Sequence, residues 1–480
     1  MQTSSFTFWK MALLVLLTIC WGLTAKANYL RISNVSQNQG AGTVTFDLAW
    51  DNSWNIDGMG SPNHWDAAWV FVKIRECNAP ASTAWTHGLV NTTLGSHTFG
   101  SLEPTLADGS AVGIDPAPNN TGVMLRHTSA GLYPSAGNVS VTLSLTNLPA
   151  TGDYEVRVFG IEMVFVPQGE YLLGGASESS RMGVGNVPTL INSEAALTSI
   201  DNTGSASFPA AWPKGYDAFY CMKYEISQGQ YAAFLNTLDA TSQLAHYPNY
   251  FNSYRHRITN GGTPPQIYYS DRPDRACNYL NWADLLAYLD WAALRPMTEM
   301  EYEKACRGSG PYIGGYAWGT SQLTEAQLVA TPEDGTELIL TANANCHYTS
   351  NNLNGGDGGN GPVRVGIFAT GTTSSRQETG ATYYGIMEMS GNVYEQMITA
   401  YNDVPSLAFD GAWGDGNLDA AGFADVPTWP YSNCTTSGCY RALRGGSFAT
   451  NNAYLYVAYR ANYYYSSGTR RYDHGGRGVR

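Results

Sequence analysis

Alternation of apolar and polar residues is the feature that most constrains the first third of this chain. Thr43–Trp50 alternates with a period of two, and so does Val139–Leu145, with valine and leucine on one face and serine and threonine on the other. Such a pattern predicts half-buried β-strands, because successive side chains of a strand point to opposite faces. Ala68–Ile74 is more continuously apolar, as expected of a central strand, and Tyr154–Phe159 is a further candidate.

Turn-forming pairs such as Asp51-Asn52 and Asp108-Gly109 separate these segments. Strands at this spacing predict an antiparallel β-sandwich over residues 28–160. Four tryptophans of this region either pack inside it or form a surface on which a sugar stacks; they are Trp50, Trp54, Trp65 and Trp69. No Pro-rich or Gly/Ser-rich linker follows, so we place a boundary near Ile161 and expect two closely docked parts.

Residues 161–480 mix short helices with much irregular chain, which predicts an α+β domain after the sandwich. Ser227 with Gln230 and Thr298 with Glu301 have the spacing of capping boxes, in which each side chain satisfies a backbone N–H at the helix start. Asn281 is a third candidate cap. Long stretches of Gly, Asn and Tyr lie between these helices, and they need support from bound ions, disulfides or buried hydrogen bonds.

The charge balance excludes one class of partner. Only 14% of the residues are charged, the net charge is −13, and no basic cluster of more than a few residues occurs. Nucleic acid binding needs concentrated Lys and Arg to neutralise phosphates, so we expect no nucleic acid partner. The low charge and the many Gly, Tyr, Trp and Asn residues are typical of loop-rich extracytoplasmic proteins.

Residues 1–27 have the layout of a signal peptide. Lys10 precedes the apolar run Met11–Trp21, which is short for a membrane span, and Ala25-Lys26-Ala27 gives a cleavage site. We therefore expect a secreted or cell-envelope protein, periplasmic or surface-exposed, with no transmembrane segment in the mature chain. A lipoprotein attached through Cys20 is less favoured because Ile19 is large for the position before such a cysteine, and a retained anchor is the other alternative.

Cysteine usage is compatible with export. One of the eight cysteines lies in the predicted signal, and the remaining seven leave at least one unpaired thiol or an intermolecular bond. Cys434 and Cys439 flank a turn-prone Thr-Thr-Ser-Gly stretch, where a local disulfide and two free thiols are both open. No spacing indicates zinc.

An ordered set of motifs across residues 161–480 resembles the formylglycine-generating enzyme (sulfatase-modifying factor) family. The motifs are Phe219–Ser227, Leu294–Glu303, Tyr316–Gly319, Gly385–Glu395, Leu443–Phe448, Arg460 and Gly478–Arg480. The resemblance implies a compact α+β domain with a twisted antiparallel sheet, a variant of the C-type-lectin-like fold.

The resemblance also implies where the catalytic ligands belong. Enzymes of this family oxidise a substrate cysteine to formylglycine with a copper ion held by two cysteine thiolates, and those positions fall on Thr450 and Leu455. Neither side chain binds Cu(I), which selects soft sulfur ligands. Copper is therefore not expected, and formylglycine-generating activity is not expected either. Related branches use histidine-bound iron, but the eight histidines show no H-x₃-H pair, so iron is not expected.

The family normally holds calcium, and the motifs place two candidate sites. The first has side chains of Asn345 and Asp357 with carbonyls of Cys346 and Gly359; the second has Glu388 and Glu395 with carbonyls of Gly391 and Val393. Carboxylate and carbonyl oxygens are the ligands that Ca²⁺ prefers. The alternative is that these Asn and Gly residues only form turns and that Glu388, where the family has Asp or Asn, is a surface charge.

These observations favour an exported noncatalytic binding or scaffold protein, a pseudoenzyme on a retained fold. Its partner would be an extended peptide, a glycan or a cell-envelope protein, and Ser447, Tyr454, Tyr456 and Arg460 are the candidate groove residues. The alternative function is a metal-dependent oxidoreductase, of sulfatase-modifying-factor or nonheme-iron type, with a relocated site. A third possibility is a rigid spacer that docks to an envelope assembly through the β domain.

Overall fold

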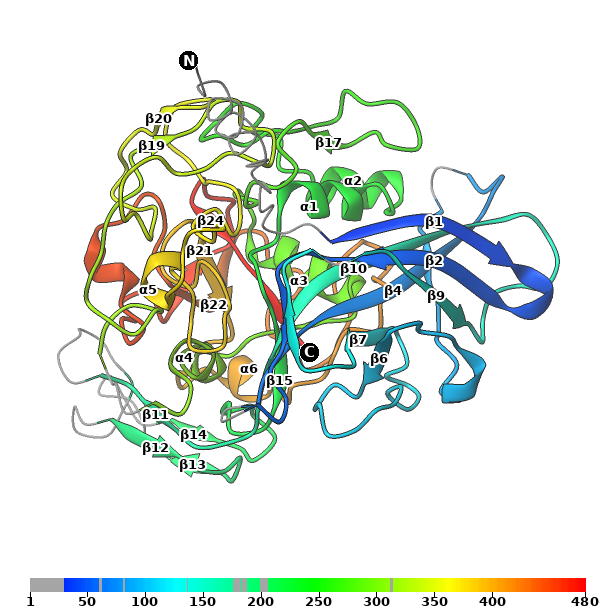
Figure 1. The fold of residues 1–480 in the computed structure, drawn as a ribbon, viewed down its shortest axis with the longest axis horizontal. Coiled ribbons are helices and arrows are strands. Elements are labelled where there is room, and N and C mark those ends of the chain that lie inside the picture. The colour runs from blue at the N-terminus through cyan, green and yellow to red at the C-terminus, as the bar shows by residue number, and fades with distance from the viewer. Residues whose placement is uncertain are drawn as a thin grey trace, which may run out of the picture.

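The computed structural model describes residues 30–59, 63–80, 83–135, 137–175, 182, 188–198, 206–310 and 314–480 (Figure 1). The predicted signal peptide, with Cys20, lies outside the described residues. Within the described ranges, no helix combines the length and the apolar character that crossing a membrane requires.

The N-terminal part contains a small antiparallel sheet of order β1-β2-β9, formed by Arg31–Asn38, Thr43–Ala49 and Val139–Ser144. The inward residues of β2 and β9 share one hydrophobic core with one face of a larger sheet. Val44, Phe46 and Leu48 are fully buried in this core, and the alternate residues Thr43, Thr45 and Asp47 are half-buried. The antiparallel sheet region predicted from the period-two pattern is therefore confirmed.

The larger sheet has the order β18-β25-β15-β10-β4-β7-β6, with β5 beside β4. Its strands are Arg295–Pro296, Gly478–Val479, Phe219–Met222, Tyr154–Val166, Asp66–Glu76, Val123–His127, Leu102–Thr105 and, for β5, Thr86–His87. The long strand β10 runs through Ile161, the predicted boundary. It pairs with β4 over its first eleven residues and with β15 over its last four, so one sheet passes through both parts of the chain.

Strand β4 is buried on both faces, which explains its continuous apolar sequence. Val70 and Val72 point toward the small sheet. Trp69 and Phe71 point the other way, toward the end of helix α3 (Trp282–Trp291), where the Trp69 indole N–H donates to the Ala292 carbonyl at 2.8 Å. Three of the four tryptophans considered as a sugar surface are at most 4% exposed, and Trp54 is half-buried.

The predicted helix caps are confirmed. Ser227 caps α1 (Gln228–Leu235), Asn281 caps α3, and Thr298 caps α4 (Glu299–Arg307), each with a reciprocal capping box. The other helices are α2 (Ala240–His246), α5 (Arg376–Thr379) and α6 (Val404–Leu407). These helices pack around the irregular chain of the C-terminal part, where α1 and α3 lie beside the large sheet (Figure 1).

A second sheet of order β23-β22-β21-β24 carries the C-terminal motifs, with strands Tyr465–Ser467, Ser437–Arg444, Tyr394–Met397 and His474–Gly475. The remaining strands form two-stranded pairs: β3 (Ser53–Asn55) with β8 (Gly131–Tyr133), β11 (Tyr171–Leu173) with β12 (Thr189–Ile191), β13 (Leu197–Thr198) with β14 (Ser207–Phe208), β16 (Ile258–Thr259) with β17 (Tyr269–Ser270), and β19 (Leu328–Val329) with β20 (Asn354–Gly355).

The Cys434–Cys439 disulfide is formed, and it joins the turn before β22 to the third residue of that strand. Five cysteines of the described ranges are free: Cys77 is exposed, and Cys221, Cys277, Cys306 and Cys346 are buried. Burial raises the pKa of the Cys306 thiol well above its usual range, so this group is held as a neutral thiol.

Candidate metal and ligand sites

The segment that follows β22 carries Thr450 and Leu455, the two positions that the motifs predict for the family's copper ligands. Gly445 and Gly446 have positive φ angles of 80° and 68° and turn the chain back. The Thr450 hydroxyl accepts a hydrogen bond from the Ser447 N–H at 2.9 Å and donates to the Ser447 carbonyl at 3.1 Å. Leu455 is fully buried among hydrophobic residues. One position therefore holds a hydroxyl engaged by its own turn, and the other a hydrocarbon.

Ser447 lies beside an acid–base pair that the motif comparison did not single out. Its hydroxyl donates to Asp473 Oδ2 at 3.4 Å, and His474 Nε2 lies 3.9 Å from Asp473 Oδ1. Both side chains are more than 90% buried, and Asp473 Oδ1 and His474 Nδ1 have no hydrogen-bond partner. Burial raises the pKa of Asp473 and lowers that of His474, so each is pushed toward its neutral form.

The four candidate groove residues differ in accessibility. Tyr454 and Tyr456 are half-buried, and the Tyr456 ring stacks on Tyr316 with 4.6 Å between centroids. Ser447 and Arg460 are fully buried, and Arg460 is engaged by an ion pair inside the domain. Within this set, only the tyrosines are open to a ligand from solvent in the described state, and a groove here stays a prediction.

The first predicted calcium set has all its oxygens engaged by protein groups. Asn345 Oδ1 accepts from the Thr324 N–H at 3.0 Å, and the carbonyls of Cys346 and Gly359 accept backbone N–H groups at 2.8 and 2.9 Å. Asp357 binds Arg272 through both carboxylate oxygens, each at 2.7 Å, and it also binds Arg275 at 2.8 Å. These donors compete with a cation for the same atoms, and calcium here stays a prediction.

The second predicted calcium set contains two carboxylate oxygens that make no hydrogen bond. Glu388, with φ 56°, is buried; its Oε1 accepts the Gly366 N–H at 2.8 Å, and its Oε2 has no partner. Glu395 Oε1 accepts from Arg477 at 2.8 Å, and its Oε2 is also buried without a partner. Burial raises the pKa of Glu388 to about 7. Two orphaned carboxylate oxygens fit a hard cation, although the Arg477 guanidinium already supplies positive charge to Glu395.

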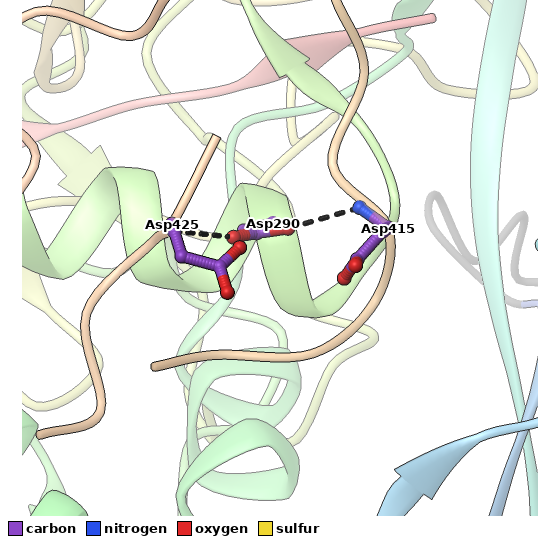
Figure 2. A group of neighbouring side chains, drawn as sticks. All are labelled: Asp290, Asp415 and Asp425. Atoms are coloured by element: carbon purple, nitrogen blue, oxygen red, sulfur yellow. Dashed lines mark hydrogen bonds between the residues drawn. The ribbon is translucent and has the colours of Figure 1, made fainter. Parts of the chain in front are cut away.

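A further carboxylate group brings together residues that are distant in sequence. Asp290 lies near the end of α3, and Asp415 and Asp425 lie on a loop that folds over it (Figure 2). One oxygen of each side chain lies within 4.8 Å of the others. Asp290 is buried and the other two are exposed, so the group opens to solvent on one side and can bind a metal such as calcium.

The buried member of this group anchors the loop. Asp290 Oδ1 accepts the Asp415 N–H at 3.0 Å, and Oδ2 accepts the Asp425 N–H at 3.1 Å, as the dashed lines in Figure 2 show. Burial raises the pKa of Asp290 to about 7. The buried ammonium of Lys73, from β4, donates to the Gly416 carbonyl of the same loop and faces these carboxylates. Sequence reasoning missed this group because its members lie on separate, unremarkable segments.

Several clefts open on the described C-terminal part. One, of about 550 Å³, lies between residues 336–344 and 367–378. A second, of about 440 Å³, is lined by arginines and by the Asp357–Asn360 turn. In the second, Arg255 and Arg275 share Glu333, at 2.5 and 2.6 Å, and Arg257 pairs with Asp271, so each of its guanidinium groups already has an acidic partner.

The fold and the motifs it carries define a protein with the sulfatase-modifying-factor framework. The family model for the sulfatase-modifying factor enzyme 1-like domain matches residues 155–480. The chain therefore belongs to this family, and the match begins at the start of β10.

Curated relatives are distant. A formylglycine-generating enzyme of Thermomonospora curvata is 26% identical over 202 residues, which is 37% of this chain and 58% of that protein. A hercynine oxygenase of Mycobacterium tuberculosis is 26% identical over 223 residues, 43% of this chain and 40% of that protein. The chain thus spans less than two thirds of the length of these relatives.

Solved structures give only a weak likeness. Treponema denticola variable protein 1 has a TM-score of 0.32 and 16% identity, with 66% of this chain and 95% of that chain covered. CarF has a TM-score of 0.28 and 14% identity, with 66% and 98% covered.

Proposed function

We propose that this chain is an exported, noncatalytic binding or scaffold protein built on a sulfatase-modifying-factor domain. The observation that carries the proposal is the pair Thr450 and Leu455 at the positions of the copper thiolates. Cu(I) selects thiolates, and neither a hydroxyl engaged by its own turn nor a buried hydrocarbon replaces them.

Retention of the framework supports a binding role over a decayed domain. The capped helix α4, the Gly-Gly turn after β22 and the buried arginines of the motifs are all in place. Keeping this framework requires selection for folding, since most substitutions in a core destabilise it. A fold that is maintained without its redox ligands is suited to presenting a binding surface to a partner.

Export is supported by the disulfide as well as by the predicted leader. Cys434 and Cys439 are bonded, and such bonds persist in oxidising compartments. We expect a fusion of residues 1–27 to a reporter to be secreted and cleaved near Asn28. Retention of the uncleaved fusion in the cytoplasm would contradict export.

Copper binding tests the noncatalytic role. Two proteins are titrated with Cu(I) against a chromogenic chelator. One is the Cys77→Ser chain, which lacks the exposed free thiol, and the other is the same chain with Thr450→Cys and Leu455→Cys added. Oxygen uptake with a cysteine-containing peptide is followed on the same samples. We expect stoichiometric Cu(I) only in the double-cysteine variant. Copper-dependent oxidation by the parent chain, above that of free copper, would contradict the proposal.

A second candidate function is a redox enzyme with a relocated metal site. The observation that favours it is the pair Asp473 and His474 beside Ser447, each with one buried atom that makes no hydrogen bond; Asp473 Oδ1 also lies 3.6 Å from Arg471 Nε. Loading with Fe(II) and measuring oxygen uptake separates the two functions. Turnover that is lost in His474→Gln and kept in His97→Gln, a histidine of the N-terminal part, would establish this second function.

A further inference from the structure

The segment 338–340 adds one isolated antiparallel bridge, between Ile339 and Val329, to the two-stranded β19–β20 pair. The Ala330 N–H donates to the Leu338 carbonyl and the Leu340 N–H to the Leu328 carbonyl, both at 2.8 Å. On its other side β19 pairs with β20. Val329 is therefore in the middle, and Ile339 lies opposite it at the edge.

The edge presents unpaired backbone groups. Because Leu338 and Leu340 use their bonding groups toward β19, the N–H and carbonyl of Ile339 point outward, as alternation along a strand requires. Neither group forms a hydrogen bond with the described residues. The Glu337 and Thr341 carbonyls on either side are engaged by Arg364 and by the Ala344 N–H, so Ile339 offers one donor and one acceptor to a residue of an added strand.

A cleft of about 550 Å³ runs along this edge. Residues 338–344 form one wall, the 370–373 loop forms the other, and the buried side chains of Ile367 and Phe368 line it between them. This volume lies within the range of about 300–1,000 Å³ that is usual for ligand pockets. The cleft thus offers an apolar lining beside open hydrogen-bonding groups.

The side chains at the edge specify the chemistry of an occupant. Leu338 and Leu340 are 41% and 56% exposed and share one face, while the Ile339 side chain packs into the core beneath. A strand paired with Ile339 would set its two flanking side chains against these leucines. Glu378 is the one ionisable residue among those lining the cleft, and the chain carries a net charge of −13, so acidic side chains are disfavoured.

We propose that this cleft binds one extended peptide segment by strand addition at Ile339, with apolar residues flanking the paired position and no acidic residue beside Glu378. The inference rests on the proposed binding role and names the class of partner. Main-chain hydrogen bonds supply affinity in such complexes, and the pockets for alternate side chains supply selectivity.

The test uses an array of blocked, fluorescein-labelled heptapeptides with Leu, Val, Thr or Ser at the three central positions and Lys at both ends. Fluorescence anisotropy on the full chain gives Kd for each. We expect the Leu-flanked peptides to bind best. N-methylation of every peptide bond keeps the side chains but removes the donors, and it should weaken binding by about tenfold or more.

Matched variants locate the site. Leu338→Ser/Leu340→Ser should weaken binding about tenfold. Leu244→Ser, at a leucine of α2 that is 73% exposed, should leave it unchanged. Ile339→Pro removes the edge N–H and should also weaken binding; if it fails to fold, the leucine double variant and the N-methylated peptides carry the test.

Three results would overturn the inference. They are no binding by any peptide of the array, binding that is insensitive to both N-methylation and the leucine double variant, and a neutral glycan that binds in a Leu338- and Leu340-dependent way instead. Copper-dependent oxidation by the parent chain is a separate result. It would contradict the proposed noncatalytic role, and the peptide-binding measurements would still test the cleft independently.

Discussion

Arg460 Nη2 lies 2.7 Å from Glu299 Oε2, and both side chains are fully buried. Arg444 contacts the other oxygen of the same carboxylate at 2.8 Å. Burial acts to raise the pKa of Glu299, but the two guanidinium groups outweigh it and hold the pKa below its usual value. The motif arginine expected near a ligand groove therefore ties α4 to the C-terminal segments.

Glu299→Gln should strongly destabilise the protein, because it removes the buried carboxylate that the Arg444 and Arg460 guanidinium groups share and leaves Arg444 with Glu303 alone. We expect the free energy of unfolding to fall by about 3–5 kcal/mol in urea titrations at neutral pH. Glu155→Gln is the control, since Glu155 pairs with Arg75 at 2.9 Å while both side chains are partly exposed. Its cost should stay within about 1 kcal/mol. Equal effects of the two variants would contradict the network's role.

Arg275 and Arg272 share Asp357 but differ in burial, which makes them a matched pair. Arg275 is 2% exposed and also binds Glu333, whereas the Arg272 side chain is 27% exposed. Arg275→Ala should cost about 3 kcal/mol, and Arg272→Ala about 1 kcal/mol or less. Thermal melts followed by circular dichroism check this. The reverse order would show that the exposed pair holds the 355–359 turn.

Stability should fall as pH rises across the range set by Glu388. Burial raises its folded pKa to about 7, whereas an unfolded glutamate has a pKa of about 4.3. Between these values the unfolded chain has lost a proton that the folded chain keeps, so raising the pH favours unfolding by up to about 1.4 kcal/mol per pH unit.

Glu388→Gln should make the slope of this pH profile between pH 5 and 7 shallower by up to about 1.4 kcal/mol per pH unit, because the neutral amide has no proton to lose; the part of the slope due to Asp290, whose pKa is also raised to about 7, should remain. Urea unfolding at several pH values measures the slope. Asp108→Asn, at an exposed aspartate of the N-terminal part, is the control and should leave the slope unchanged. A Glu388→Gln curve parallel to that of the parent chain would show that Glu388 does not titrate in this window.

Calcium should stabilise the parent chain through the Asp290–Asp415–Asp425 group. At a hundredfold excess of Ca²⁺ over Kd, a single site adds about 2.7 kcal/mol. Asp415→Asn/Asp425→Asn should abolish this gain and keep the loop, because the Asp290 contacts are to backbone N–H groups. A calcium-induced shift in melting temperature that survives in the double variant would move the site elsewhere, with the open oxygens of Glu388 and Glu395 the next to test.

Much of the fold could be predicted locally. A helix start depends on residues within four positions of one another, as at Thr298 and Glu301. The buried face of a strand is indicated by alternation with a period of two, as in Thr43–Ala49. The nearly continuous β-prone stretch Glu155–Pro167 indicates two closely docked parts with a boundary near Ile161, and β10 continues through that boundary. Sheet pairing depends on partners that are distant in sequence, so the local pattern could not show that one sheet passes through both parts.

The candidate sites also combine features that the sequence alone indicates with features that only the tertiary structure shows. The sequence alone predicts that Thr450 and Leu455 occupy the positions of the copper thiolates, because the residue type at a motif position can be identified without the tertiary structure. Only the tertiary structure decided that Arg460 is buried against Glu299, that Asp357 is held by arginines, and that Asp290 meets two aspartates more than a hundred residues away. Burial and pairing of charges arise when separate segments pack together, and that packing is a property of the whole folded chain.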